Sequence, residues 1–206
     1  EIVNLPGNVT MSSRDGTVVL LDDLVREATE RALAVVREKN PELDPQTMQE
    51  VARTVAMGAI KYPMISRENT KIVTFDWETA LDFEGQSAPY IQYAVVRAKS
   101  ILRKAASISI HPPEYDYPLS TPEVNLIEKI SKLPDEIQRA AKEMKPSLLA
   151  VYAYELARNF NDFYNQCHVL GEAEKVQNAR LALVDAARIA LEDVLVILGI
   201  KAPQVM

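Results

Sequence analysis

The sequence predicts an all-α protein, a helical bundle preceded by a short irregular amino-terminal segment. Only 6 of the 206 residues are Gly, whereas the strong helix formers Ala, Leu, Glu and Lys are abundant. From Asp22 onward, apolar residues recur at spacings of three and four almost without interruption. That period is typical of amphipathic helices that bury one face.

The amino-terminal residues, 1 to about 20, do not follow this period. They contain Gly7 and Gly16 and the β-branched run Thr17-Val18-Val19. Such a composition favours extended pieces joined by a loop.

Helix boundaries can be placed from local signals. Ser120 and Glu123 form a candidate capping box, and Pro134 and Pro146 suit first helical turns. We expect helices at 22–39, 46–61, 88–107, 121–132, 134–144, 146–168 and 172–198, with irregular stretches near 62–87 and 108–119.

The last two helices each carry one long apolar stripe and are joined by a short loop with Gly171. We therefore expect them to pack as antiparallel neighbours. The stripes are Leu149, Tyr152, Leu156, Phe160, Phe163 and Cys167, and Val176, Ala179, Leu183, Ala187, Ala190, Val194 and Leu198.

Composition restricts the function classes. The net charge of −6 argues against nucleic acid as a partner, unless the cations gather on one face. No apolar run has the length that spans a bilayer, and no signal peptide is visible. Because Cys167 is the only cysteine, no internal disulfide can form, which favours a cytoplasmic protein. The first residue is not Met, so we expect a fragment of a longer protein.

No catalytic constellation stands out. The two histidines, His111 and His168, lie far apart in sequence, and neither metal-site spacing nor a phosphate-binding glycine motif is present. We expect no metal site, and the residues alone do not favour an independent enzyme.

One face of helix 88–107 has the chemistry of a nucleic-acid surface. Tyr90, Tyr93, Arg97 and Lys104 fall together, away from the apolar stripe. The rings can stack on unpaired bases and the cations can contact phosphates. An alternative is that the tyrosines pack under a neighbouring helix and the cations are merely solvated.

A second such face lies on helix 146–168, where Asn161, Tyr164 and His168 are about one turn apart. Their ring, amide and imidazole can stack on a base and hydrogen-bond to it. A half-buried Tyr and a helix-terminal His explain the same pattern without a ligand.

Several segments, in order, resemble arginyl-tRNA synthetases. Phe75-Asp76-Trp77-Glu78, Pro89-Tyr90-Ile91-Gln92-Tyr93-Ala94 and the run from Glu155 to Tyr164 carry the resemblance, as does the ending Leu198 to Met206. Asp185-Ala186-Ala187-Arg188 departs from the family's Asp-Ala-Leu-Arg signature only in its third residue.

The amino-terminal segment also resembles this family, at its KMSKS signature loop, which assists ATP. The matching residues are Thr10, Met11, Ser12, Ser13 and Arg14. Thr10 stands where the signature has its first Lys. The resemblance divides the chain into residues 1–21, a remnant of the catalytic domain, and 22–206, a helical tRNA-binding domain with its DALR core at about 115–206.

The resemblance implies a parent enzyme that joins arginine to its tRNA, using ATP and Mg²⁺. The catalytic domain with its HIGH signature is missing from this chain, so we expect the fragment to be inactive alone and to bind no cofactor. The implied partner is arginine tRNA, with no DNA and no membrane.

The family's helical domain contacts the anticodon arm, which suggests roles for individual residues. Tyr90, Tyr93, Tyr164, His168 and Met206 are expected at anticodon-loop bases, and Asn161 is a further candidate for tRNA binding. Arg97 and Lys104 are candidates for phosphate contacts or for core ion pairs. Arg188 is a candidate for a phosphate contact or for a buried pair with Asp185 or another carboxylate, and we favour the structural role.

Two alternatives remain open at this stage. Cysteinyl-tRNA synthetases carry a related helical domain, although the PYIQYA segment and the carboxy-terminal sequence favour arginine. A non-catalytic helical interaction module would show no preference for tRNA over other polyanions.

Overall fold

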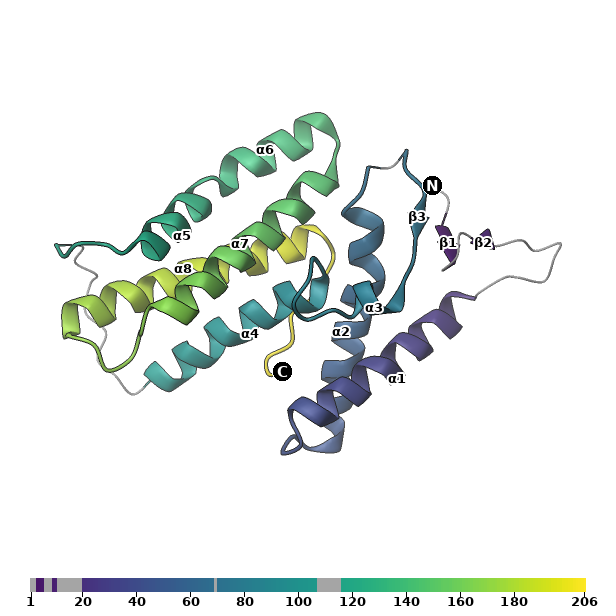
Figure 1. Ribbon diagram of the computed structural model, residues 1–206, viewed down its shortest axis with the longest axis horizontal. Helices are drawn as coiled ribbons and strands as arrows, with labels where there is room; N and C mark the ends of the chain where they lie inside the picture. Colours follow the sequence, from purple (N-terminus) through teal and green to yellow (C-terminus); the bar gives the residue numbers. More distant parts are fainter. Residues whose placement is uncertain (1–2, 6–8, 11–19, 69, 107–115) are drawn as a thin grey trace.

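The computed structural model describes residues 3–5, 9–10, 20–68, 70–106 and 116–206. Within these ranges the chain is predominantly helical, which confirms the predicted fold class (Figure 1). The helices are α1 (Leu21–Lys39), α2 (Pro45–Ile65), α3 (Trp77–Ala80), α4 (Ala88–Ala105), α5 (Thr121–Ser131), α6 (Leu133–Glu143), α7 (Pro146–Gln166) and α8 (Glu174–Ile197).

A small sheet lies beside the amino-terminal helices. Strand β1 (Val3–Leu5) pairs antiparallel with β2 (Val9–Thr10) and parallel with β3 (Val73–Thr74). The extended amino-terminal pieces were predicted, whereas β3 and α3 lie in the stretch 62–87 that was predicted to be irregular.

Two hydrophobic cores hold the helices together. The first is formed by α1, α2 and α3 with Phe75, the residue that follows β3, and also includes Val36 and Val55. The second is the bundle of α4 to α8, which Tyr62 of α2 also joins. In Figure 1 the two groups of helices lie side by side, with the carboxy terminus between them.

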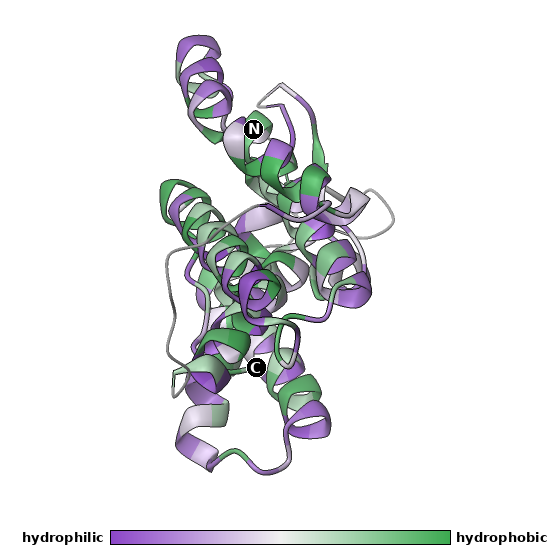
Figure 2. Ribbon diagram, turned by 90° about the vertical axis from the view of Figure 1, so that its left-hand side faces the viewer, coloured by the Kyte–Doolittle hydropathy of each residue, from purple (hydrophilic) through white to green (hydrophobic). Residues whose placement is uncertain are grey.

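The bundle follows the predicted apolar stripes. Every predicted stripe residue of α7 is buried, as are those of α8 except the half-buried Val176. In Figure 2 the helical ribbons carry both hydrophobic and hydrophilic residues, as amphipathic helices do. Gly171, in the loop between α7 and α8, has a φ angle of 85°, and Gly199, just after α8, has a φ angle of 66°. Gly adopts this left-handed conformation without strain.

Some helix ends differ from those predicted. Helix α2 continues through Pro63 to Ile65 instead of ending at residue 61. Helix α7 ends at Gln166, so His168 lies in the loop beyond the helix and not in its last turn. Among the helices the structure describes, none is long and apolar enough to cross a membrane.

Candidate nucleic-acid interface

An open cleft of about 490 Å³ lies where the two cores meet. Its walls come from the end of α1, the segment after α3, one face each of α4 and α7, and the last residue. The lining residues are Val35, Val36, Lys39, Asn40, Phe83, Glu84, Tyr90, Tyr93, Arg97, Asn161, Asp162, Asn165 and Met206.

Arg97 is fixed in the cleft by neighbours from two helices. Its guanidinium carbon lies 4.4 Å from the centre of the Tyr93 ring and 4.8 Å from that of Tyr164. Its Nη1 donates a 2.8 Å hydrogen bond to Oδ1 of the buried Asn161. Each cation–π contact contributes about 0.5–1 kcal/mol at a partly exposed site, so the two rings and the amide hold the planar cation in one orientation.

Tyr90 lies at the start of α4, where local structure fixes it. The Tyr90 backbone N–H donates to Oγ of the N-cap residue Ser87 at 3.2 Å. Its ring packs at 5.3 Å, centre to centre, against Tyr154 of α7. Because Tyr90 is only half-buried, part of its ring remains available to a ligand in the cleft.

The predicted site residues are therefore only partly brought together. Tyr90, Tyr93, Arg97, Asn161 and Met206 line the cleft. Tyr164 contacts Arg97 from the rim and is 41% exposed.

The remaining predicted residues lie outside the cleft. Lys104 is exposed in the last turn of α4, and His168 is exposed beyond α7. Thr10 belongs to β2, and Met11, Ser12, Ser13 and Arg14 lie outside the described residues.

Sequence reasoning missed the wall that α1 contributes. Lys39 lies in the last turn of α1, with its Nζ 5.8 Å from the centre of the Phe83 ring, and Asn40 is the C-cap of that helix. No local pattern could reveal these residues, since packing between distant elements brings them to α4. Asn165 could have been found, because it lies one turn beyond Asn161.

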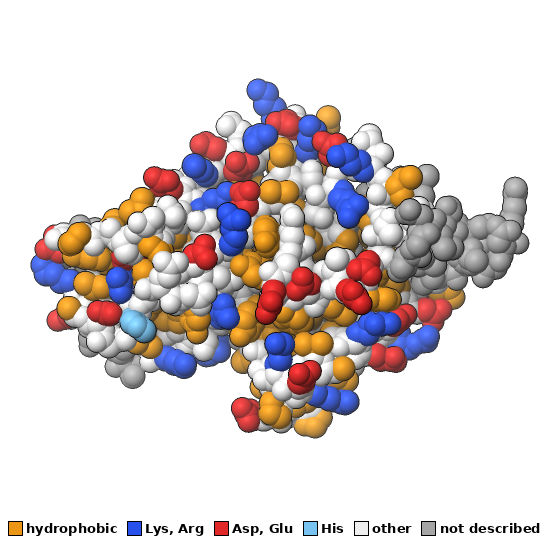
Figure 3. Space-filling view, viewed as in Figure 1, with side chains coloured by type: hydrophobic (Ala, Val, Ile, Leu, Met, Phe, Trp, Pro, Cys, Tyr) orange, Lys and Arg blue, Asp and Glu red, His pale blue; other side chains and the backbone are white. Residues whose placement is uncertain are grey.

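The charges in the cleft are mixed. Lys39 and Arg97 supply positive charge, and Glu84 and Asp162 supply negative charge. Over the wider surface, acidic and basic side chains are interspersed on the face shown in Figure 3. The cleft is thus suited to an aromatic or polar group beside a phosphate.

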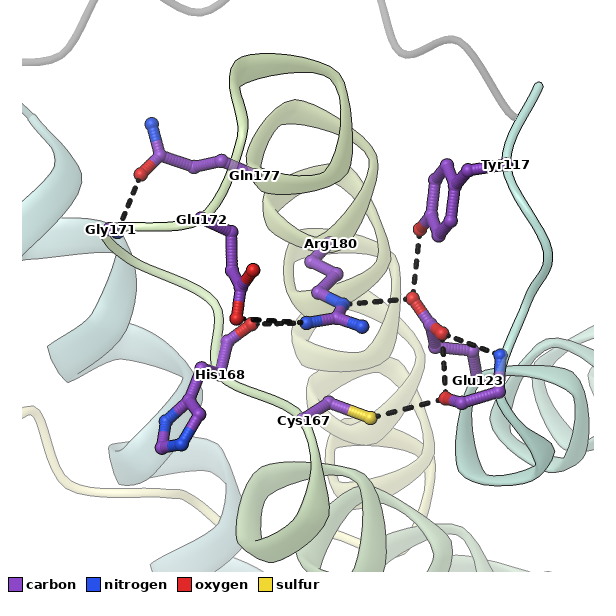
Figure 4. Close-up of polar contacts among 9 residues, drawn as sticks. Tyr117, Glu123, Cys167, His168, Gly171, Glu172, Gln177 and Arg180 are labelled. Carbon is purple, nitrogen blue, oxygen red and sulfur yellow. Dashed lines mark hydrogen bonds and ion pairs between the residues drawn. The ribbon is translucent and has the colours of Figure 1, made fainter.

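A second polar cluster joins α5, α8 and the loop between α7 and α8 (Figure 4). The Glu123 carboxylate, 1% exposed, accepts hydrogen bonds from Arg180 at 2.9 Å, from Tyr117 at 2.8 Å and from the Ser120 N–H at 2.8 Å. Burial opposes ionisation of Glu123, but these hydrogen bonds outweigh it and lower the pKa to about 2. Arg180 also donates to the His168 backbone carbonyl at 2.6 Å, so the cluster fixes the loop and not the imidazole.

The signature residues Asp185 and Arg188 form an ion pair with a shortest N–O distance of 2.7 Å. Arg188 also contacts Glu192, which in turn pairs with Lys99 of α4 at 2.8 Å. The predicted pair is present and is part of a network that ties α8 to α4.

Two family models match the chain. Residues 91–206 match the DALR anticodon binding domain. Residues 6–77 match the family described as tRNA synthetases class I (R), catalytic domain.

Curated proteins and solved structures agree with these matches. The chain is 44% identical over 207 residues to arginine–tRNA ligase of Methanoregula boonei and 43% identical over 208 residues to that of Methanocella arvoryzae, in each case covering 100% of this chain and 36% of the relative. The arginyl-tRNA synthetase of Thermus thermophilus superposes with a TM-score of 0.91 at 37% identity, over 99% of this chain and 34% of that one. That of Plasmodium falciparum gives a TM-score of 0.79 at 28% identity, over 92% of this chain and 34% of that one. The chain thus spans about a third of the length of these proteins.

Proposed function

The chain belongs to the arginyl-tRNA synthetase family, and from this premise we propose that its helical part binds the anticodon loop of arginine tRNA. The parent enzyme would attach arginine to that tRNA. One observation carries the proposal: aromatic, cationic and amide side chains from α4 and α7 meet in one open cleft.

The chemistry of the cleft suits an unpaired base. The partly exposed rings of Tyr90 and Tyr93 offer stacking surfaces, and stacking on such a ring contributes about 1–3 kcal/mol per base. Asn165 offers both a donor and an acceptor to a base edge. Met206 adds an apolar contact, and the cations Lys39 and Arg97 can contact the adjoining phosphates.

The remaining roles of the parent enzyme are part of the same proposal. Arginine, ATP and Mg²⁺ would bind mainly to the part of the enzyme outside this chain, with Thr10 to Arg14 assisting ATP. No group of three or more His, Cys, Asp and Glu side chains in the described ranges could hold a metal ion, so we assign Mg²⁺ no ligand here. We further propose that the chain alone does not charge tRNA, that it acts in the cytoplasm, and that DNA is not its partner.

Replacing Tyr90 and Tyr93 together tests the cleft. The double substitution Tyr90→Ala and Tyr93→Ala should weaken binding of the arginine tRNA anticodon stem-loop by more than about tenfold, because two stacking surfaces are lost. The matched control is Tyr90→Phe with Tyr93→Phe, which keeps both rings and should keep most of the affinity. Fluorescence anisotropy with a labelled stem-loop measures both.

Unchanged affinity in a folded Tyr-to-Ala double variant would reject the role of these rings. Equal affinity for unrelated polyanions would favour a general interaction module instead. Arginylation of tRNA by the isolated chain would contradict the proposal that the chain alone does not charge tRNA.

A further inference from the structure

The carboxy-terminal residues 199–206 lie across both cores. Ile200 and Ala202 pack against the α4–α8 bundle, whereas Val205 and Met206 pack against the core of α1 and α2. In Figure 1 this tail leaves α8, turns back and ends between α4 and α1. It is the segment that brings Met206 into the cleft.

Three side chains hold this tail by its backbone carbonyls. Lys61 of α2 donates to the carbonyl of Gly199, Gln92 of α4 to that of Lys201, and Arg103 of α4 to that of Gln204. The three carbonyls are spread along the tail, so each donor fixes a different part of it.

Gln92 is the central of these anchors and is fully buried. Its Nε2 donates to the Lys201 carbonyl at 2.6 Å and to the Thr54 carbonyl of α2 at 3.2 Å, so one amide links α4, α2 and the tail. Helix α2 comes close because residue 58 is Gly: a Cβ there would lie 2.9 Å from Nε2 of Gln92.

The orientation of this amide is dictated by its partners. Two carbonyl oxygens face it, and only the NH₂ group can donate to both. Its own Oε1 is buried without a hydrogen-bond partner. Burying an unpaired oxygen costs free energy, and a side chain that served packing alone would avoid that cost.

We infer that Gln92 is a positioning residue for tRNA recognition, which holds the tail so that Met206 forms part of the anticodon cleft. This inference rests on the function proposed above, and it concerns a residue that does not itself line the cleft. Loss of the amide donors would release the tail while leaving the tyrosines and Arg97 in place.

Gln92→Met is the most direct test, made in the full-length enzyme that carries this chain. Met has a similar size, and it removes the unpaired oxygen together with the two donors, so the fold should be kept. Limited proteolysis followed by mass spectrometry should show faster cleavage within residues 199–206. The matched control is Gln138→Met, the same exchange at an exposed position of α6, which should leave the tail protected.

Steady-state kinetics distinguish a role of Gln92 in positioning the tail from a general loss of enzyme activity. Gln92→Met should raise the KM for arginine tRNA by about tenfold with kcat changed by less than about twofold, as expected for lost uniform binding. Met206→Ala should have a similar effect. The double variant should be no worse than either single variant, because both changes remove the same contact.

Each outcome decides a separate point. An unchanged cleavage rate in folded Gln92→Met overturns the anchoring role, whatever happens to tRNA. If the KM increases of the two single variants multiply in the double variant, Gln92 does not act through Met206, and that part of the inference is overturned. If the tail is released but neither single variant changes KM, the proposed role of Met206 in tRNA binding fails, and with it the inference.

A second variant covers the case in which Gln92→Met does not fold. Arg103 is exposed, so Arg103→Ala removes one anchor without disturbing either core. It should release residues 204–206 and raise KM in the same direction by a smaller factor. If residues 204–206 stay fully protected from proteolysis in Arg103→Ala, the inference that side-chain donors hold the tail in place is overturned.

Discussion

At the scale of single residues, the Glu123–Arg180 pair gives the sharpest prediction. Glu123→Gln should lower the free energy of unfolding by about 3 kcal/mol, because it leaves the largely buried Arg180 cation with only the more distant carboxylate of Glu172, at 3.7 Å. The matched control is Asp116→Asn, which breaks the exposed pair with Lys175 and should cost less than about 1 kcal/mol. Urea unfolding measures both, and equal small losses would contradict a structural role for Glu123.

The same carboxylate predicts how stability depends on pH. The pKa of Glu123 is lowered from 4.5 to about 2 in the folded protein. Its contribution, about 3 kcal/mol from the size of that shift, is therefore present above pH 4.5 and is lost as the pH falls from about 4.5 toward about 2. The difference in unfolding free energy between the wild type and Glu123→Gln should shrink over that range, and a constant difference would contradict the low pKa.

How far residue-level prediction succeeds is shown by the tyrosine face of α4. Helical periodicity placed Tyr90, Tyr93 and Arg97 together, and the structure confirms that they share the cleft. It also grouped Lys104 with them, but seven residues of helix span about 10 Å, and Lys104 lies outside the cleft. Periodicity predicts which residues share one face of a helix. It does not predict at which point along the helix another helix packs against that face. That these residues bind tRNA stays a prediction.

At the scale of elements, sequence signals predict an element correctly where neighbouring residues in the chain determine it. The capping box at Ser120 and Glu123 begins α5 as predicted. Strand β3 could not be foreseen, because Val73 and Thr74 pair with Val3 and Asn4, about seventy residues earlier. Helix α2 passes Pro63 because that residue lies in the last turn, where one lost hydrogen bond is tolerated.

The end of α6 gives an element-scale prediction. Met144 closes this helix with φ at 53°, and its side chain is 84% exposed. Met144→Gly should raise the free energy of unfolding by about 0.5–1 kcal/mol. The left-handed conformation costs a non-Gly residue about 1–2 kcal/mol, and Gly removes that cost. Part of the gain is offset because Gly gives the unfolded chain more conformational entropy. Thermal unfolding checks this against Met144→Ala, which keeps the strained conformation and should bring no gain.

At the scale of the whole molecule, the two cores and the tail between them determine the cleft. One wall is built from α1 and the other from α4 and α7, so the cleft exists only when both groups of helices are in place. The predicted boundary between residues 21 and 22 stays a prediction. The division of hydrophobic cores, by contrast, falls between α3 and α4.

Because the net charge is −6, salt dependence tests the proposal that this acidic protein binds a polyanion. If local cations contact phosphates, the affinity for the anticodon stem-loop should fall linearly with the logarithm of salt concentration. Lys39→Ala, in the cleft, should reduce the steepness of that line by about 0.7, the value for one phosphate contact on a single strand. Tyr90→Ala, whose ring packs on Tyr154 and not on Arg97, should instead lower the affinity at every salt concentration with the slope unchanged, because stacking releases no counterions. Lys142→Ala, at an exposed position of α6 away from the cleft, is the control and should change neither. A slope that Lys39→Ala and Lys142→Ala alter equally would mean that overall charge, and not the cations of the cleft, governs binding.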